Sequence, residues 1–300
     1  MPELPEVETI RRQLEPRIRG ARIERLEVLD PRWTRPAEPR EVESQVSGRT
    51  IEALRRRGKY LLLDLEGGTT LIMHLRMTGN LILLEEGAQV VAVDEDEPGA
   101  DDRYLRARFD LGDGRELRFS DPRRFGEAFL LPSAGVDARF EGRVGIEPLS
   151  GELTVEAIEA LAAGRRAPLK SFLLDQAGIA GVGNIYADEA LWRAELHPLS
   201  PAGSMRSEHA EALWEGVIGA LRAGLEGGGA SIGDYLDSRG ERGSMQDEFL
   251  VHRREGEPCP RCGQEIRRIV VSGRSTYFCP GCQVRLRRRP RRKGRGRPVS

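Results

Sequence analysis

The feature that most restricts the fold is a set of four cysteines near the end of the 300-residue chain. Two CPxC turns carry them, 16 residues separate the turns, and the four are Cys259, Cys262, Cys279 and Cys282. This spacing is typical of a zinc site in which each turn supplies two thiolates to one ion. Four thiolates complete a tetrahedral shell and leave no position for substrate, so the pattern predicts one structural Zn²⁺. Two disulfide bonds are the alternative, and they are rare in cytoplasmic proteins.

The chain shows no sign of export or membrane insertion. It has no run of ~18 apolar residues, and its first ten residues, MPELPEVETI, lack the basic and apolar regions of a secretory signal. We therefore expect a cytoplasmic protein with no membrane partner. Hydrophobic residues make up 39% of the chain, so it is not disordered in bulk, and its length suggests two domains.

The net charge of −1 hides a basic C-terminus. Residues 285–300 hold nine of the 47 basic residues and no acid, so the rest of the chain is acidic. A basic tail on an acidic body is common in nucleic-acid-binding proteins, although a solvated, disordered tail explains it equally well. Only three residues are lysine, namely Lys59, Lys170 and Lys293. Because arginine keeps its proton, amine chemistry is limited to these lysines and the N-terminus.

Hydrophobic periodicity divides the chain into a strand-rich part and a helical part. Apolar residues at helical spacing predict a helix over 2–19. Strands are predicted at residues 22–29, 50–57, 60–65, 70–75, 81–84, 105–110, 116–120 and 128–131, with a loop at 85–102. Many short strands joined by Gly-Gly and Asp-Gly turns predict a sandwich or barrel. Helices are predicted near residues 155–161, 172–174, 185–192 and 210–225.

These patterns predict five consecutive segments. They are a strand-rich domain at 1–132, a linker at 133–150, a helical domain at 151–255, a zinc finger at 256–284 and a basic, disordered tail at 285–300.

Sequence motifs along the chain resemble those of one enzyme family. In order, they are MPELPEVETIRR, RRGKYLLLDL, HLRMTG, DPRRFG, GIEPL, LKSFLLDQAGIAGVGNIYADEALW, REGEPCPRCG and GRSTYFCPGC. Together they resemble the bifunctional formamidopyrimidine-DNA glycosylase family over nearly the whole chain up to Gln283. The first residues are similar to the branch that acts on purine lesions, since the endonuclease VIII branch typically begins PEGPE.

The resemblance implies an α+β multidomain fold. An N-terminal β-sandwich with a leading helix would precede a helix–two-turns–helix domain with a four-cysteine zinc finger. The helix–two-turns–helix motif would occupy about 168–193, and a lesion-reading loop about 230–246.

The resemblance also implies catalytic roles. Pro2 would attack C1′ of the damaged nucleotide and form a Schiff base, followed by two eliminations. Glu3 would be the general acid/base, with Glu6 as a possible further acid. Lys59 would assist near the lesion, and Arg274 would grip a flanking phosphate. From the residues alone, Pro2 and Glu3 are an ordinary helix start, although an α-amino group of pKa about 7.7–8.0 is partly neutral and nucleophilic.

The implied DNA contacts are more dispersed. Met77, Arg123 and Phe125 match an intercalating triad that fills the gap left by the flipped nucleotide. Without the resemblance, Met77 and Phe125 would be assigned to the core. Further implied contacts are Arg165, Lys170 and Asn184, and the small residues of AGIAGVGN are expected where backbone approaches a phosphate.

Four departures from the family pattern bear on lesion preference. Arg76 stands where the family often has Gly. Tyr104 stands where a phosphate-binding His is expected. Gly233 occupies a position that is often basic, and Ser244 with Met245 replaces an aromatic-containing pair.

We therefore expect a monomeric DNA glycosylase/AP lyase that binds damaged duplex DNA at the nucleoid. It would excise 8-oxoguanine opposite cytosine and formamidopyrimidines. Two alternatives remain open at this point. One is an endonuclease VIII-like enzyme for oxidised pyrimidines, and the other is a non-catalytic DNA-binding zinc protein.

Overall fold

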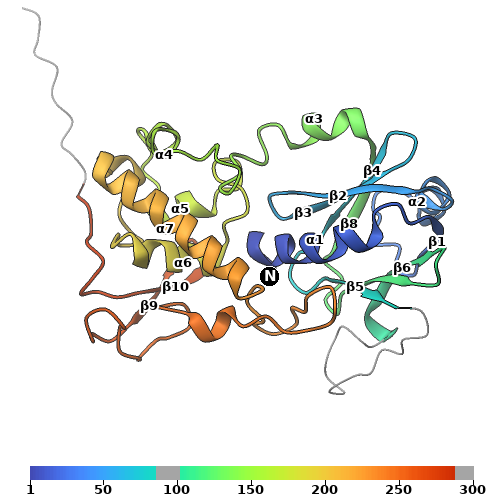
Figure 1. Ribbon diagram of the computed structural model, residues 1–300. Helices are drawn as coiled ribbons and strands as arrows, with labels where there is room; N and C mark the ends of the chain where they lie inside the picture. The colour runs from blue at the N-terminus through green and yellow to red at the C-terminus, as the bar shows by residue number, and fades with distance from the viewer. Residues whose placement is uncertain (86–101, 288–300) are drawn as a thin grey trace, which may run out of the picture.

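The computed structural model describes residues 1–85 and 102–287. Figure 1 shows two halves side by side, with antiparallel sheets in one and helices with a short β-hairpin in the other. The helix α1 (Leu4–Ile18) lies between them and contacts both β2 of the first half and α7 of the second. The start of the chain is therefore at the junction of the two halves.

The N-terminal half is a sandwich of two four-stranded antiparallel sheets. One sheet has the order β1-β6-β7-β5 and the other β2-β3-β4-β8. The strands are β1 (Ile23–Val28), β2 (Ile51–Arg57), β3 (Tyr60–Leu65), β4 (Thr69–His74), β5 (Asn80–Leu84), β6 (Leu105–Leu111), β7 (Glu116–Ser120) and β8 (Glu127–Pro132). One apolar core contains residues from both sheets and from α1, as expected for a sandwich whose inner faces pack together.

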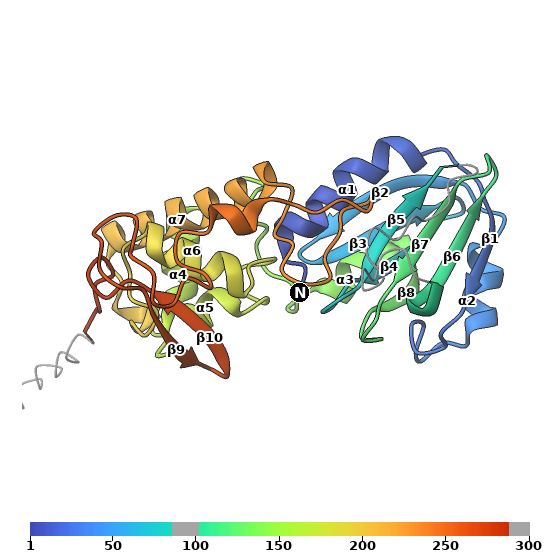
Figure 2. The ribbon, with the colours of Figure 1, turned by 90° about the horizontal axis from the view of Figure 1, so that it is seen from below.

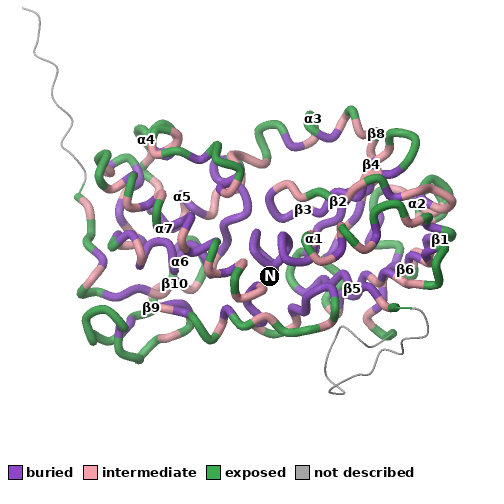
Figure 3. The backbone as a smooth tube through the Cα atoms, in the orientation of Figure 1, coloured by how far each residue is buried: buried purple, intermediate pink, exposed green. Residues whose placement is uncertain are grey.

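The sequence of α1 explains its position. Val7, Ile10, Leu14 and Ile18 follow helical spacing, and all four are fully buried in the sandwich core. Pro5 lies in the first turn, where its missing N–H leaves no hydrogen bond unmade. In Figure 3 the backbone at the start of this helix is buried on the central side of the molecule.

The C-terminal half packs around its own core. Its helices are α4 (Val155–Ala162), α5 (Leu169–Leu174), α6 (Asn184–Arg193) and α7 (Ser207–Glu226). A separate apolar cluster joins these helices, and α6 packs along α7. The hairpin of β9 (Arg267–Val271) and β10 (Arg274–Phe278) follows, and β10 contacts α6. The predicted fold class is therefore confirmed.

Two short helices were absent from the sequence prediction. They are α2 (Pro39–Val46), in which only Val42 and Val46 are buried, and α3 (Val136–Phe140), which lies in the predicted linker. Two buried residues are too few to give a helical period. Four single turns are also present, η1 (Asp102–Tyr104), η2 (Ser133–Gly135), η3 (Ala202–Ser204) and η4 (Met245–Glu248).

Parts of two predictions lie outside the described residues. Residues 86–101 make up most of the acidic loop predicted at 85–102, and residues 288–300 make up most of the basic tail. Among the described residues, no helix is both long and apolar enough to cross a membrane.

The segment after α7 returns to the N-terminal half. In Figure 2 it runs from α7 toward the sandwich and passes beside α1. The Leu83 N–H donates to the Ser238 carbonyl at 2.9 Å, and the Asn80 side chain donates to the Asp234 carbonyl at 2.7 Å. The predicted lesion-reading loop is thus attached to β5 in this structure.

Candidate active site and metal centre

The start of the chain is inserted between the two halves. Pro2 and Glu3 are buried, and the Leu4 N–H donates to the Gly181 carbonyl at 3.0 Å. The Glu3 carboxylate accepts the backbone N–H of Ile185 at 3.0 Å and, more weakly, that of Tyr186 at 3.3 Å. Both donors lie in the first turn of α6, where unpaired N–H groups and the helix dipole favour a negative charge. The fold therefore fixes this carboxylate beside Pro2.

Two glycines make this insertion possible. A Cβ on Gly183 would overlap the Glu3 carboxylate, and a Cβ on Gly181 would lie 2.6 Å from Leu4 Cβ. We predicted that the small residues of AGIAGVGN let backbone approach a phosphate. In the structure, these two positions make space for the first residues of the chain, and the approach of a phosphate stays a prediction.

Glu6 is a second buried carboxylate in the same place. It accepts the Tyr186 hydroxyl at 2.6 Å, the Ala230 N–H at 2.8 Å and the Glu3 N–H at 2.7 Å. Burial and the neighbouring Glu3 charge raise the pKa of Glu6, and these three hydrogen bonds oppose the rise. Glu6 therefore connects the start of α1 to α6 and to the segment after α7.

Lys59 approaches this group from the turn between β2 and β3. Its Nζ donates to the Val182 carbonyl at 3.1 Å, and the side chain is buried. Burial lowers the pKa of Lys59, the carboxylates of Glu3 and Glu6 act to raise it, and the Arg274 charge lowers it further. The charges of Glu3, Glu6 and Arg274 thus all act on Lys59 in this structure.

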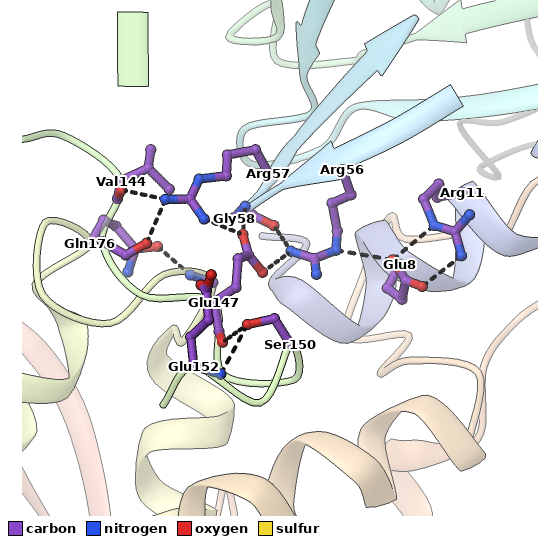
Figure 4. Close-up of polar contacts among 12 residues, drawn as sticks. Glu8, Arg11, Arg56, Arg57, Gly58, Val144, Glu147, Ser150, Glu152 and Gln176 are labelled. Atoms are coloured by element: carbon purple, nitrogen blue, oxygen red, sulfur yellow. Dashed lines mark hydrogen bonds and ion pairs between the residues drawn. The ribbon is translucent and has the colours of Figure 1, made fainter. Parts of the chain in front are cut away.

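Figure 4 shows how this turn is attached to the rest of the protein. Glu147, between the two halves, accepts the Gly58 N–H and, at 2.7 Å, the Arg56 guanidinium. Arg56 also donates to Glu8 of α1 at 3.0 Å. We did not predict roles for these residues, although Glu147 lies in the quoted motif GIEPL. Their contacts position the backbone next to Lys59.

The β-hairpin brings Arg274 to the same side. Arg274 is exposed at the start of β10, and the Asn184 amide donates to the neighbouring Ser275 carbonyl at 3.0 Å. Asn184 Oδ1 is buried without a hydrogen-bond partner in the described structure. Asn184 therefore joins the start of α6 to the strand that carries Arg274.

The four cysteines form a centre that fits zinc. Their Sγ atoms all lie within 4.8 Å of one another, with Cys259–Cys282 at 3.8 Å and Cys262–Cys279 at 3.4 Å. A tetrahedral site with Zn–S bonds of about 2.3 Å places its sulfurs about 3.8 Å apart. Disulfide bonds would need about 2.05 Å, so that alternative is wrong. The centre binds one structural Zn²⁺.

Met77 and Phe125, two members of the predicted triad, are on the surface. The side chains are 39% and 54% exposed, which excludes the core interpretation of these two residues. The Arg123 guanidinium lies 5.0 Å from the centre of the Phe125 ring. Single exposed apolar side chains are common on protein surfaces, so the exposure alone does not show a binding surface, and insertion into DNA stays a prediction.

Lys170, a predicted phosphate contact, lies on α5. It is fully buried, and its Nζ donates to Asp188 at 2.6 Å and to the Asn184 carbonyl at 2.7 Å. Burial lowers the pKa of Lys170, and the Asp188 charge opposes this shift. The ammonium has no exposed surface in this structure, and its direct contact with a phosphate stays a prediction. Its hydrogen bonds join α5 to α6.

The other predicted contacts are accessible. Arg165 is partly exposed and pairs with Asp175 at 2.7 Å, and Tyr104 is partly exposed in η1.

Two of the departures from the family pattern differ in burial. Gly233 has φ +85° and open space around it, whereas Met245 is fully buried in the helical core. Met245 is therefore a packing residue of the helical half.

Comparison with known proteins gives three consecutive family matches. They are the formamidopyrimidine-DNA glycosylase N-terminal domain over 1–128, its H2TH domain over 144–235, and the zinc finger found in FPG and IleRS over 256–284. A Roseiflexus sp. (strain RS-1) protein named formamidopyrimidine-DNA glycosylase is 46% identical over 286 residues, 94% of this chain and 100% of the relative. One from Chloroflexus aurantiacus is 43% identical and covers 95% and 99%.

Solved structures agree with these matches. The complex of Lactococcus lactis Fpg with abasic-site DNA has a TM-score of 0.84 at 34% identity, covering 94% of this chain and 100% of that one. A variant of the same protein with Fapy-dG DNA has a TM-score of 0.84 at 35% identity, covering 94% and 99%.

Proposed function

The chain belongs to the formamidopyrimidine-DNA glycosylase family, and we infer that it excises oxidised purines from damaged duplex DNA in base excision repair. The observation that carries this inference for the chain itself is the position of Glu3. Its carboxylate is fixed by α6 at the start of the chain, with the Lys59 ammonium within electrostatic range. This arrangement supports a reaction in which the amine of Pro2, the Glu3 carboxylate and the Lys59 ammonium act together.

We propose that Pro2 is the nucleophile. Removal of Met1 exposes its secondary amine, which attacks C1′ of the damaged nucleotide as the base departs. Glu3 takes up and returns the protons of ring opening and Schiff-base formation. Lys59, whose pKa burial lowers, donates a proton near the leaving base more readily than an exposed lysine would. Two eliminations then cut the strand on both sides of the sugar.

We propose that the zinc finger positions Arg274 for a phosphate beside the lesion. When bound, Zn²⁺ supplies a fixed tetrahedral centre for the two CPxC turns and takes no part in bond breaking. A planar guanidinium suits bidentate phosphate binding. Asn184 contributes by attaching β10 to the start of α6.

Flipping the nucleotide costs a few kcal/mol of stacking and leaves a gap. We propose that Met77 and Phe125 enter this gap and that Arg123 contacts the orphaned base, since all three side chains are exposed. Arg165 and Tyr104 would contact the backbone. We further propose a monomer acting at the nucleoid, with the domain limits predicted above.

Borohydride trapping on a duplex with 8-oxoguanine opposite cytosine tests this function. Wild type should give a covalent adduct that maps to Pro2, and Pro2→Gly should lose most of the adduct and of the β,δ-elimination. Pro5→Ala, in the first turn of α1, is the control and should trap normally. An adduct on a lysine would contradict the assignment of Pro2. Reaction with a thymine-glycol duplex alone would favour the endonuclease VIII-like alternative.

A further inference from the structure

Two side chains of the N-terminal half hold the predicted lesion-reading loop, residues 230–246, from outside the loop itself. The first is Asn80, at the start of β5. Its amide donates to the Asp234 carbonyl at 2.7 Å, and its Oδ1 accepts the Leu236 N–H at 2.9 Å. Asn80 is fully buried, and buried polar groups are costly to leave unpaired, so this attachment is specific. Asn80 has no role in the function proposed above.

The second side chain is Gln13 of α1, which holds the next turn of the loop. Its Nε2 donates to the Asp237 carboxylate at 2.6 Å, and its Oε1 accepts the Ser238 N–H at 3.0 Å and the Ser238 hydroxyl at 2.8 Å. Asp237 is buried and closes the turn, because its Oδ1 accepts the N–H groups of Arg239 and Glu241, both at 2.9 Å. Gln13 therefore fixes a turn that already has a defined shape.

Between its attachments the loop passes the start of the chain. At its beginning, the Ala230 N–H donates to the Glu6 carboxylate at 2.8 Å. Residues 234–238 are bonded to the sandwich half, whereas Gly233, between these points, has open space around it. Figures 1 and 2 both show the segment after α7 running close to the N-terminus before it reaches the sandwich. The attachments therefore determine where the open part of the loop lies relative to Pro2.

We propose that Asn80 and Gln13 are positioning residues that hold this loop against a damaged base, and that they set the preference of the enzyme for a base-bearing lesion over an abasic site. The proposal rests on the proposed function, because it assumes that the loop contacts the base. A loop that is ordered before DNA binds loses little conformational freedom on binding, so its contacts are not offset by the cost of ordering it. An abasic site has no base and gains nothing from the loop.

Single-turnover kinetics on two substrates tests the proposal. Gln13→Ala keeps α1, because alanine is the strongest helix former, and it removes the contacts with Asp237 and Ser238. Excision of 8-oxoguanine opposite cytosine should slow about tenfold, which corresponds to the loss of one hydrogen bond. Cutting of the same duplex with a preformed abasic site should proceed at the wild-type rate.

Asn80→Ala should show the same split between the two substrates, since it removes the bonds to Asp234 and Leu236. Gln45→Ala, which removes an exposed glutamine of α2, is the matched control and should behave as wild type on both. Equal slowing on the two substrates would mean that Asn80 and Gln13 only support the fold, and it would overturn the proposal. Unchanged excision of 8-oxoguanine in both variants would overturn it as well.

Limited proteolysis with trypsin measures the loop without any reaction on DNA. Arg239 and Arg242 are exposed within the loop, and cleavage after them should be faster in Gln13→Ala than in wild type, because cleavage follows the population of the open segment. Equal cleavage rates would show that Gln13 does not hold the loop and would overturn the proposal. Wild type that excises no damaged base would contradict the proposed function, and the trypsin result would then support or overturn the attachment of the loop by itself.

Discussion

At the scale of single residues, Gly183 shows how closely the two halves approach at the start of the chain. Gly183→Ala would place a methyl group on the Glu3 carboxylate and displace it from the Ile185 N–H. Because misplacement of a catalytic group by about 1 Å can cost about 100-fold, we expect at least that loss in the rate of excision. Single-turnover kinetics on an 8-oxoguanine duplex measures it.

The control for this prediction is in the same loop. A Cβ on Gly178 would meet no atom closer than 3.5 Å, so Gly178→Ala should retain the wild-type rate. If Gly178→Ala were also slow, the loss of rate in Gly183→Ala could not be assigned to displacement of the Glu3 carboxylate.

The exposed residues Met77 and Phe125 allow binding to be separated from folding. Met77→Ala and Phe125→Ala should change the free energy of unfolding by less than about 0.5 kcal/mol, because neither side chain is buried. Each should weaken binding to the tetrahydrofuran duplex by about 5-fold to 100-fold, the range expected for lost stacking on a base. Leu29→Ala, which removes another exposed side chain, is the control. Destabilisation without weaker binding would contradict the proposed insertion.

The role of a residue could be predicted where a local sequence pattern determines its partners. The spacing of the four cysteines places two ligands in each turn, and the zinc centre was therefore predictable. Lys170 matched a motif, but its burial against Asp188 depends on packing between α5 and α6, which no local pattern contains. The same holds for Glu147, whose partners Arg56 and Gly58 lie 91 and 89 residues earlier in the chain.

At the scale of elements, α6 connects the start of the chain to the zinc centre. Its first turn donates to Glu3, and near its end the Trp192 indole N–H donates to Cys259 Sγ at 3.4 Å. The Arg261 guanidinium lies 4.0 Å from the centre of the Trp192 ring, and it donates to the backbone carbonyl of Trp192 at 3.1 Å. Hydrogen bonds to metal ligands orient them and typically change metal affinity by about 10–100-fold.

Trp192→Phe removes this hydrogen bond while keeping an aromatic ring. We expect zinc affinity to fall about tenfold, which is measured as transfer of zinc to a competing chelator. Trp214→Phe is the matched control, because its indole N–H donates to the Leu153 carbonyl and not to a thiolate. If both variants release zinc as wild type does, the Trp192 contact does not stabilise the centre.

Helices and strands could be predicted where polar and apolar side chains follow a regular spacing over enough residues. The strands β3 and β7 have the predicted bounds, because hairpin turns and flanking residues limit them on both sides. The helix α3 is only five residues long, and its apolar residues Val136 and Phe140 pack on a sheet that the sequence does not place beside them. Short helices of this kind are set by tertiary contacts.

At the scale of the whole molecule, the two halves are joined by polar contacts on both sides of α1. On one side, Glu8 and Glu147 share Arg56. On the other side, the segment after α7 bonds to Gln13, whose side chain accepts the N–H and hydroxyl of Ser238. Arg56 and Glu147 are 91 residues apart in sequence, and Gln13 and Ser238 are 225 residues apart. These contacts could not be predicted from local patterns.

The Glu8 contacts predict a pH dependence of stability. Burial alone would raise the pKa of Glu8, but hydrogen bonds from Arg11 and Arg12 and the Arg56 charge outweigh it and lower the pKa from 4.5 to about 2. A carboxyl with a lowered pKa in the folded state stabilises the protein above its unfolded pKa. The contribution is lost as pH falls from 4.5 toward 2.

Glu8→Gln should therefore lower the free energy of unfolding by about 1–2 kcal/mol at pH 7, a figure reduced for solvent screening of this partly exposed network. The corresponding fall in Tm is several degrees, and it should shrink steadily as wild type and variant are compared at lower pH, below 4.5. Glu15→Gln, which removes a surface pair with Arg19 at 3.6 Å on the same helix, should change Tm little at any pH. A Tm difference for Glu8→Gln that is the same at pH 7 and pH 3 would show that lost packing, and not the charge shared with Arg56, accounts for it.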